Sequence, residues 1–244
     1  MILTIDIGNT RIKGAVFEHN TLVEYFVFTN NELKININNI LKTYNFITNM
    51  IVVSVKEINI EEIINLNNNI KVDIISHQQH FPFTNLYATP LTLGLDRMVL
   101  AAGAVLMFPN QNRLIIDAGT CITYDFVDCK NIYHGGAISP GFRLRYESLH
   151  NYTAKLPLLN LEIPKTFIGN STNNAIHSGV VNGLVFEIDG FTEKYKSQFS
   201  NFIIILTGGD SVFLAKRLKN TIFANSNFLL ESLNKIYQYK IKND

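Results

Sequence analysis

The sequence has few cysteines, no tryptophan and no long apolar run. Cys121 and Cys129 are the only cysteines among 244 residues, which is too few for a disulfide framework and the wrong spacing for a zinc site. No uninterrupted apolar stretch approaches the roughly 20 residues that a membrane-spanning helix needs. Asp6 interrupts the apolar N-terminus, which also lacks the cationic region of a signal peptide. We therefore expect a cytoplasmic protein with no membrane partner.

An excess of charge is also lacking. The chain has 21 lysine and arginine residues against 20 aspartate and glutamate residues, a formal net charge of +1, and they form no long run. Binding to a polyanion needs an excess or a cluster of cations, so we expect no nucleic-acid partner. The hydrophobic share of 47% is typical of a folded globular protein, and the length suffices for one large or two small cores.

The first stretch, residues 1–13, predicts a β-hairpin with a polar tip. An apolar run rich in β-branched residues leads to Asp6, Gly8 marks a turn, and alternation then resumes. Backbone N–H groups, a hydroxyl, an amide and two cationic side chains suit phosphate oxygens, and Asp6 could orient a hydrated Mg²⁺. Ordinary turns select similar residues, so this stretch alone leaves a plain hairpin equally open. The candidate phosphate-binding residues are Asp6, Ile7, Gly8, Asn9, Thr10, Arg11, Ile12 and Lys13.

A second copy of this hairpin lies near the middle of the chain. Residues 113–125 again read as an apolar strand, then Asp117, a small turn with Gly119 and Thr120, and renewed alternation. A repeated strand–turn–strand unit with an acidic tip predicts two similar α/β lobes that enclose a nucleotide.

Hydrophobic periodicity predicts the remaining elements. In the first half, three strands are followed by helix, strand, helix and strand, which is the order of a ribonuclease-H-like lobe. We expect two such lobes, residues 1–112 and 113–244, with a central cleft. Beyond the first hairpin, the expected strands are three within 113–138 together with 22–28, 50–55, 71–75 and 202–206, and the expected helices are 30–49, 60–66, 94–108, 171–195 and 227–239.

The expected helix 94–108 begins with Gly94-Leu95-Asp96-Arg97. An aspartate in a first helical turn is commonly a surface residue that interacts favourably with the helix dipole. The same dipole keeps Asp96 ionised, so this carboxylate could also accept a proton from an alcohol during phosphoryl transfer. The residue types alone leave both interpretations open.

Several motifs together resemble one family. The duplicated Asp-x-Gly-Thr hairpins resemble the phosphate loops of the acetate and sugar kinase, Hsp70 and actin superfamily. Within it, further stretches resemble the type III pantothenate kinases, in the order of that family and over nearly the whole chain. These stretches are 94–97 (GLDR), 134–141 (HGGAISPG), 153–157 (TAKLP), 169–172 (GNST) followed by Ser178-Gly179, and 207–209 (TGG).

This resemblance implies an actin-like fold and a reaction. ATP would phosphorylate the primary hydroxyl group of pantothenate, the first step toward coenzyme A, with Asp96 as the general base. Thr10 and Lys13 would hold phosphates, and Thr120 would contact ATP from the second lobe. The positions implied for pantothenate are Tyr87, Gly94, Leu95, Asp96, Arg97 and Thr172. Leu95 replaces the more usual alanine of the motif, so we expect an effect on binding rather than on chemistry.

The resemblance also implies cofactors and an assembly. Family members use Mg²⁺ with ATP and a monovalent cation, K⁺ or NH₄⁺, at the position that matches Asp117. A carboxylate at a second phosphate loop can bind a cation that offsets the charge of the triphosphate. The family builds its sites at a subunit interface, so we expect a homodimer.

Two alternatives share the fold. A catalytically silent transcriptional accessory protein would predict the loss of Asp6, Asp96 or Asp117, and all three are present. A sugar or acetate kinase should lack the Gly-x-Asp-Arg stretch ahead of the second lobe, and that stretch is present as well. Both observations favour the pantothenate kinase interpretation.

Overall fold

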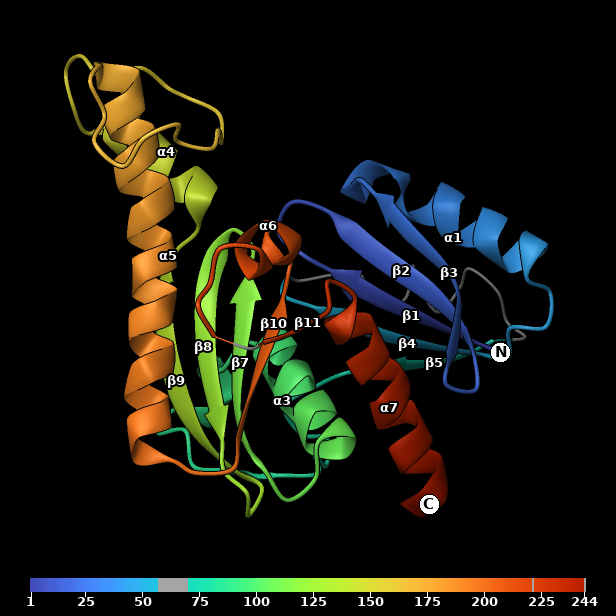
Figure 1. Ribbon diagram of the computed structural model, residues 1–244. Coiled ribbons are helices and arrows are strands. Elements are labelled where there is room, and N and C mark those ends of the chain that lie inside the picture. Colours follow the sequence, from blue (N-terminus) through green and yellow to red (C-terminus); the bar gives the residue numbers. More distant parts are fainter. Residues whose placement is uncertain (57–69, 221, 244) are drawn as a thin grey trace. The chain divides into compact units, whose positions relative to one another are not determined.

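The chain divides into two units in the computed structural model, which describes residues 1–56, 70–220 and 222–243 (Figure 1). The expected helix at 60–66 lies outside the described residues. Unit 1 comprises Met1–Pro109, Asn131–Tyr133 and Asn227–Asp244, and unit 2 comprises Asn110–Lys130 and His134–Ser226. No helix among the described residues is long and apolar enough to cross a membrane.

Unit 1 is built on a five-stranded sheet with the strand order β3-β2-β1-β4-β5. β1 pairs antiparallel with β2 and parallel with β4, which agrees with the expected ribonuclease-H-like lobe. Every residue of β1 is buried, as expected for a central strand covered on both faces. The strands are β1 (Ile2–Ile7), β2 (Ile12–Glu18), β3 (Thr21–Phe28), β4 (Asn49–Ser54) and β5 (Lys71–Ile74).

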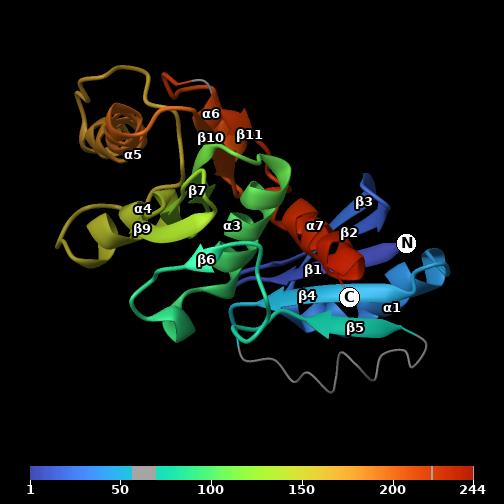
Figure 2. The same cartoon turned by 90° about the horizontal axis from the view of Figure 1, so that it is seen from below.

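Helices cover this sheet. The helix α1 (Leu33–Thr43) follows a short 3-10 helix, η1 (Asn30–Glu32), and buries Ile37 and Ile40 in one core with β1 and β4. It ends earlier than the expected 30–49, because the segment from Tyr44 turns back into β4. The helices α3 (Leu95–Met107) and α7 (Phe228–Asn243) lie side by side in both views (Figures 1 and 2), and α7 contacts β1, β2 and β4.

The helix α7 belongs to unit 1, whereas we expected residues 227–244 to belong to the second lobe. Leu230, Leu233 and Ile236 of α7 are buried in unit 1. The Asn234 side-chain amide donates a hydrogen bond of 2.8 Å to the carbonyl oxygen of His19, after β2. The physical reason is the amphipathic face of this helix, which the first sheet covers.

Unit 2 begins with the same strand–turn–strand arrangement as unit 1. β7 pairs antiparallel with β8 and parallel with β10, as β1 does with β2 and β4. Its strands are β7 (Asn112–Ala118), β8 (Cys121–Val127), β9 (Ile132–Pro140), β10 (Phe202–Thr207) and β11 (Phe223–Ala224). The short strand β6 (Thr84–Asn85) pairs with the first two residues of β9, which belong to unit 1.

The long helix α5 forms much of the core of unit 2. It runs along the sheet (Figure 1) and buries Val180, Leu184 and Ile188 against Leu114, Tyr124 and other residues of β7, β8 and β10. The predicted helix at 171–195 is confirmed and extends by one further turn. The helices of this unit are α4 (Phe142–Asn151), α5 (Thr172–Gln198) and α6 (Ser211–Ala215).

The close packing of α3 on α7 yields a stability prediction. A Cβ atom added at Gly103 would overlap the Ser232 side chain and lie 3.0 Å from its Cα atom. Gly103→Ala should therefore lower the free energy of unfolding by about 1–3 kcal/mol, although alanine alone favours a helix. Urea unfolding of Gly103→Ala, Ser232→Gly and the double variant measures this. In the Ser232→Gly background the loss should shrink or change sign, and an undiminished loss would contradict the predicted contact.

Candidate active site

The first hairpin has an exposed polar tip and a buried carboxylate. Asp6 pairs with Lys13 across the hairpin, and the Gly8 N–H group donates a hydrogen bond of 3.1 Å to the carbonyl oxygen of Arg11. Asn9, Thr10 and Arg11 are exposed at the tip, whereas Asp6 is only 8% exposed. The hairpin therefore offers backbone N–H groups, a hydroxyl and cations to solvent above a buried carboxylate.

The charges at this tip also act on β3. Burial raises the pKa of Tyr25, the negative charge of Asp6 raises it further, and the positive charge of Arg11 opposes the shift. The carboxylate and the guanidinium group are thus close enough to one phenol to act on it in opposite directions.

A further cation, which the sequence patterns did not indicate, reaches the tip. The Lys56 ammonium group donates a hydrogen bond of 2.6 Å to the carbonyl oxygen of Asn9. Lys56 follows β4, and the parallel pairing of β4 with β1 brings it to the hairpin. No local motif signals this contact, because the two residues are 47 positions apart in the sequence.

Asp96 lies at the N-terminus of α3, as predicted. Its Oδ1 atom accepts a hydrogen bond of 2.8 Å from the Arg97 backbone N–H group. Gly94 is the N-cap residue, and a Cβ atom there would overlap Asp96 Oδ1. The glycine of the Gly-x-Asp-Arg stretch thus leaves room for the carboxylate, and the positive end of the helix favours its ionised form.

Arg97 and Tyr87 form the other part of this region. Arg97 is only 6% exposed, and its guanidinium carbon lies 5.7 Å from the centre of the Tyr87 ring, within the range of a cation–π contact. The Tyr87 N–H group donates a hydrogen bond of 2.9 Å to Asn85 Oδ1. Leu95, the unusual residue of the motif, is half-buried. Unit 1 therefore brings together every residue predicted to bind pantothenate except Thr172.

The second hairpin carries the candidate cation site. Asp117 pairs with Thr123 across the hairpin, so their side chains lie on the same face of the sheet. Thr123 Oγ1 is buried and has no hydrogen-bond partner among the described residues. A carboxylate beside an unpartnered hydroxyl oxygen is a donor set that fits a hard monovalent cation. Thr120 is exposed at the tip of this hairpin.

Two glycine motifs pack directly on this hairpin. Gly208 has a φ of +90°, and a Cβ atom there would overlap Asp117 Oδ1 and the Ala118 carbonyl group. The Asp210 N–H group donates a hydrogen bond of 3.0 Å to Ala118 O, and burial raises the pKa of the Asp210 carboxyl group. From the other motif, the Gly141 N–H group donates a hydrogen bond of 3.0 Å to Thr120 O.

Thr172 belongs to unit 2, at the start of α5. The N-cap Ser171 accepts a hydrogen bond of 3.3 Å from the Asn174 N–H group, which fixes this end of the helix. Thr172 lines a cavity of about 620 Å³ together with Arg145, Ser148 and a mostly apolar wall from α4 and α5. Glu187 pairs with Arg145 and accepts a hydrogen bond of 2.9 Å from the hydroxyl group of Tyr124.

The fold and the paired hairpins define the class of protein: a two-sheet α/β fold that is similar to the fold of a solved sugar kinase. A glucokinase from an Antarctic psychrotroph has a TM-score of 0.54 at 12% identity over 98% of both chains. A conserved protein assigned to the Baf family of transcriptional activators, from Campylobacter jejuni, has a TM-score of 0.64 at 22% identity over 98% of this chain and 99% of that chain. At these identities the likeness shows the fold alone.

Sequence relatives then identify the family. A family model described as Type III pantothenate kinase matches residues 2–194. The type III pantothenate kinase of Flavobacterium johnsoniae is 64% identical over 244 residues, which are 100% of both chains. The chain belongs to the type III pantothenate kinase family, as the motifs predicted.

The glycine pair after β10 provides a matched test of the second hairpin. Gly208→Ala should lower the free energy of unfolding by about 2–4 kcal/mol, because alanine is strained at this φ and overlaps Ala118. Gly209→Ala is the control, since a Cβ atom there meets nothing within 4 Å among the described residues. Urea unfolding compares the two variants, and equal stabilities would contradict the packing of this glycine on Asp117.

Proposed function

We propose that the chain transfers the γ-phosphoryl group of ATP to the primary hydroxyl group of pantothenate, the first step toward coenzyme A. Membership of the type III pantothenate kinase family, with relatives of that name matching over the full length, is the observation that carries this proposal. The presence of Asp6, Asp96 and Asp117 disfavours the silent regulator, and the curated relatives from Flavobacterium johnsoniae, Flavobacterium psychrophilum and Christiangramia forsetii are named type III pantothenate kinase.

The first hairpin binds the phosphates of ATP in this proposal. Backbone N–H groups at the exposed tip, the Thr10 hydroxyl and the Lys13 ammonium group donate to phosphate oxygens. Asp6, buried beneath them, would hold Mg²⁺ through its hydration water. When bound, the metal would supply positive charge that offsets the charge of the phosphates during transfer.

Asp96 acts as the general base. The hydroxyl oxygen of pantothenate attacks the γ-phosphorus, its proton passes to the Asp96 carboxylate, and the bond to the β-phosphate oxygen breaks to release ADP. The contact of Gly94 and the Arg97 N–H group with this carboxylate fixes its orientation. Arg97 and Tyr87, held together by their cation–π contact, position pantothenate together with residues 94–95. The family resemblance adds Thr172 as a proposed contact for pantothenate.

Asp117 and Thr123 would hold a monovalent cation, K⁺ or NH₄⁺, and Thr120 would contact ATP from the same hairpin. Thr123 Oγ1, buried beside the carboxylate and without a hydrogen-bond partner among the described residues, supports this assignment. When bound, the cation offsets part of the triphosphate charge. We also propose a cytoplasmic location, which agrees with two exposed cysteines, Cys121 and Cys129, that form no disulfide.

The proposed base and cation give a kinetic prediction. Asp96→Asn should lower kcat for pantothenate-dependent ADP release by about 10²–10⁴-fold, the usual contribution of a general base, while MgATP still binds. Glu18→Gln, which changes an exposed carboxylate on the same unit, should leave turnover unchanged. Assays in potassium, ammonium and sodium buffers test the cation. Full activity of Asp96→Asn would exclude Asp96 as the base, and equal rates in all buffers would exclude the cation requirement.

We further propose a homodimer, and the surface around α5 supports it. Phe167, Ile168 and Phe186 are 68%, 79% and 53% exposed, and the rings of the two phenylalanines lie 6.2 Å apart. An exposed apolar cluster of this kind is typical of an interaction surface. A Cβ atom added at Gly183 or Gly190 of α5 would meet nothing within 4 Å among the described residues. The absence of a side chain at these positions leaves room for another helix to approach closely.

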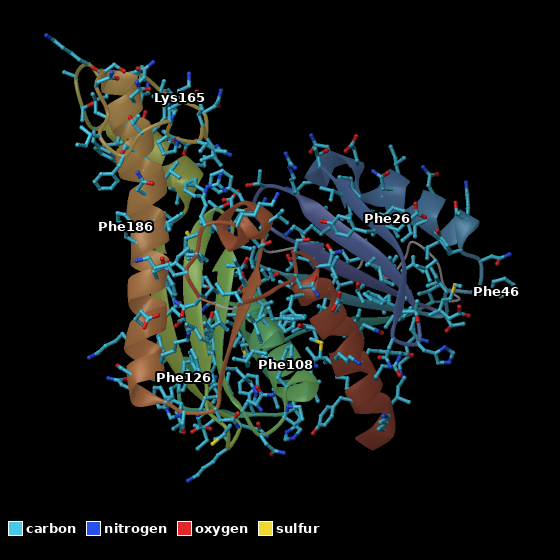
Figure 3. The ribbon with its side chains drawn as sticks, in the orientation of Figure 1. Phe26, Phe46, Phe108, Phe126, Lys165 and Phe186 are labelled. Atoms are coloured by element: carbon cyan, nitrogen blue, oxygen red, sulfur yellow. The ribbon has the colours of Figure 1, made fainter. Side chains whose placement is uncertain are left out.

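Phe186→Asp should convert the dimer to a monomer, because it places a charge at the centre of this apolar cluster. Phe46→Asp is the matched control, since Phe46 is another exposed phenylalanine, 74% exposed, and belongs to unit 1, whereas Phe186 belongs to α5 of unit 2 (both are labelled in Figure 3). Light scattering at one protein concentration compares the wild type with both variants. A monomeric wild type would remove the homodimer proposal, and a dimeric Phe186→Asp would move the interface elsewhere.

A further inference from the structure

The backbone before Lys56 is held firmly against the first hairpin. Val55 continues the parallel pairing of β4 with β1, because its N–H group donates a hydrogen bond of 3.2 Å to the carbonyl oxygen of Ile7. The Ser54 hydroxyl accepts a hydrogen bond of 3.1 Å from the Lys56 N–H group and donates one of 2.9 Å to its carbonyl oxygen. Lys56 therefore leaves the end of β4 in a fixed direction, beside the point where β1 enters the hairpin.

The side chain of Lys56 contacts the tip of the first hairpin. The Lys56 ammonium group lies 2.6 Å from the carbonyl oxygen of Asn9, the residue that follows the turn glycine. An ammonium group has three N–H donors, and this bond uses one of them. The group is thus held at the tip, and its other donors have no hydrogen-bond partner in the part of the chain that the structure describes.

The charges that the described residues contribute at the tip favour an anion. Arg11, Lys13 and Lys56 contribute three positive charges, while Asp6 contributes one buried carboxylate. The hairpin and the residues after β4 lie at the same edge of the sheet, because β1 and β4 run parallel. Ligands of open α/β sheets bind at this carboxyl edge.

We propose that Lys56 is an additional ligand for the triphosphate of ATP. Its ammonium group bridges the Asn9 carbonyl oxygen and non-bridging phosphate oxygens, so it both holds the tip of the hairpin and adds a charge to the nucleotide site. The inference rests on the proposed function only in that ATP is the ligand. It is a role for a residue outside the Asp-x-Gly-Asn-Thr hairpin itself.

Nucleotide affinity tests this role. Titration calorimetry with magnesium and a non-hydrolysable ATP analogue is applied to the wild type, Lys56→Ala, Lys56→Arg and the control Lys42→Ala, which removes an exposed lysine from α1. Lys56→Ala should weaken binding by about 5–30-fold, the range for the loss of one charged hydrogen bond in a partly exposed site. Lys56→Arg should restore most of the affinity, and Lys42→Ala should match the wild type.

Steady-state kinetics separate a phosphate contact from a general loss of structure. Lys56→Ala should raise KM for ATP, leave KM for pantothenate unchanged and reduce the dependence of nucleotide affinity on salt. Nucleotide affinity of Lys56→Ala equal to that of Lys42→Ala would overturn the inference, as would equal rises in both KM values without rescue by arginine. If the wild type binds the analogue but does not phosphorylate pantothenate, the proposed function fails while the affinity ratios still decide the role of Lys56.

Discussion

The parallel pairing of the first strand of each unit with a later strand is the constraint on which the rest of the site depends. In unit 1, β1 pairs with β4, and the end of β4 delivers Lys56 to Asn9 at the hairpin tip. In unit 2, β7 pairs with β10, and the end of β10 delivers Gly208 to Asp117. Each acidic hairpin is thus completed by a segment distant in sequence, which reaches the same sheet edge because the strands run in the same direction.

Close approach of backbone explains why glycine occurs where the chemistry lies. Gly94 leaves space for the Asp96 carboxylate at the start of α3, and Gly208 leaves space for Asp117 in a conformation that side chains rarely adopt. Both carboxylates therefore lie directly against the backbone of a glycine, and this contact limits their orientation. The glycine that gives the carboxylate room comes from the same motif for Asp96 and from a distant motif for Asp117.

Local sequence patterns predicted most of the helices and strands, but they could not predict contacts between distant segments. The two hairpins and the order of the strands along unit 1 followed from alternation and turn residues, which act over a few positions. The Lys56 contact with Asn9 and the packing of α7 on unit 1 depend on pairing across 47 and 215 positions. Thr123 also escaped notice, because an alternating strand residue gains its role only from facing Asp117 across β7 and β8.

The most direct test of the whole account is the chemical identity of the product. Wild-type protein is incubated with MgATP and pantothenate in potassium buffer, and the product is analysed by mass spectrometry and phosphorus NMR. The account predicts a phosphate monoester on the primary hydroxyl group of pantothenate, formed in equal amount with ADP. A folded protein that binds MgATP and forms no phosphorylated pantothenate would contradict it.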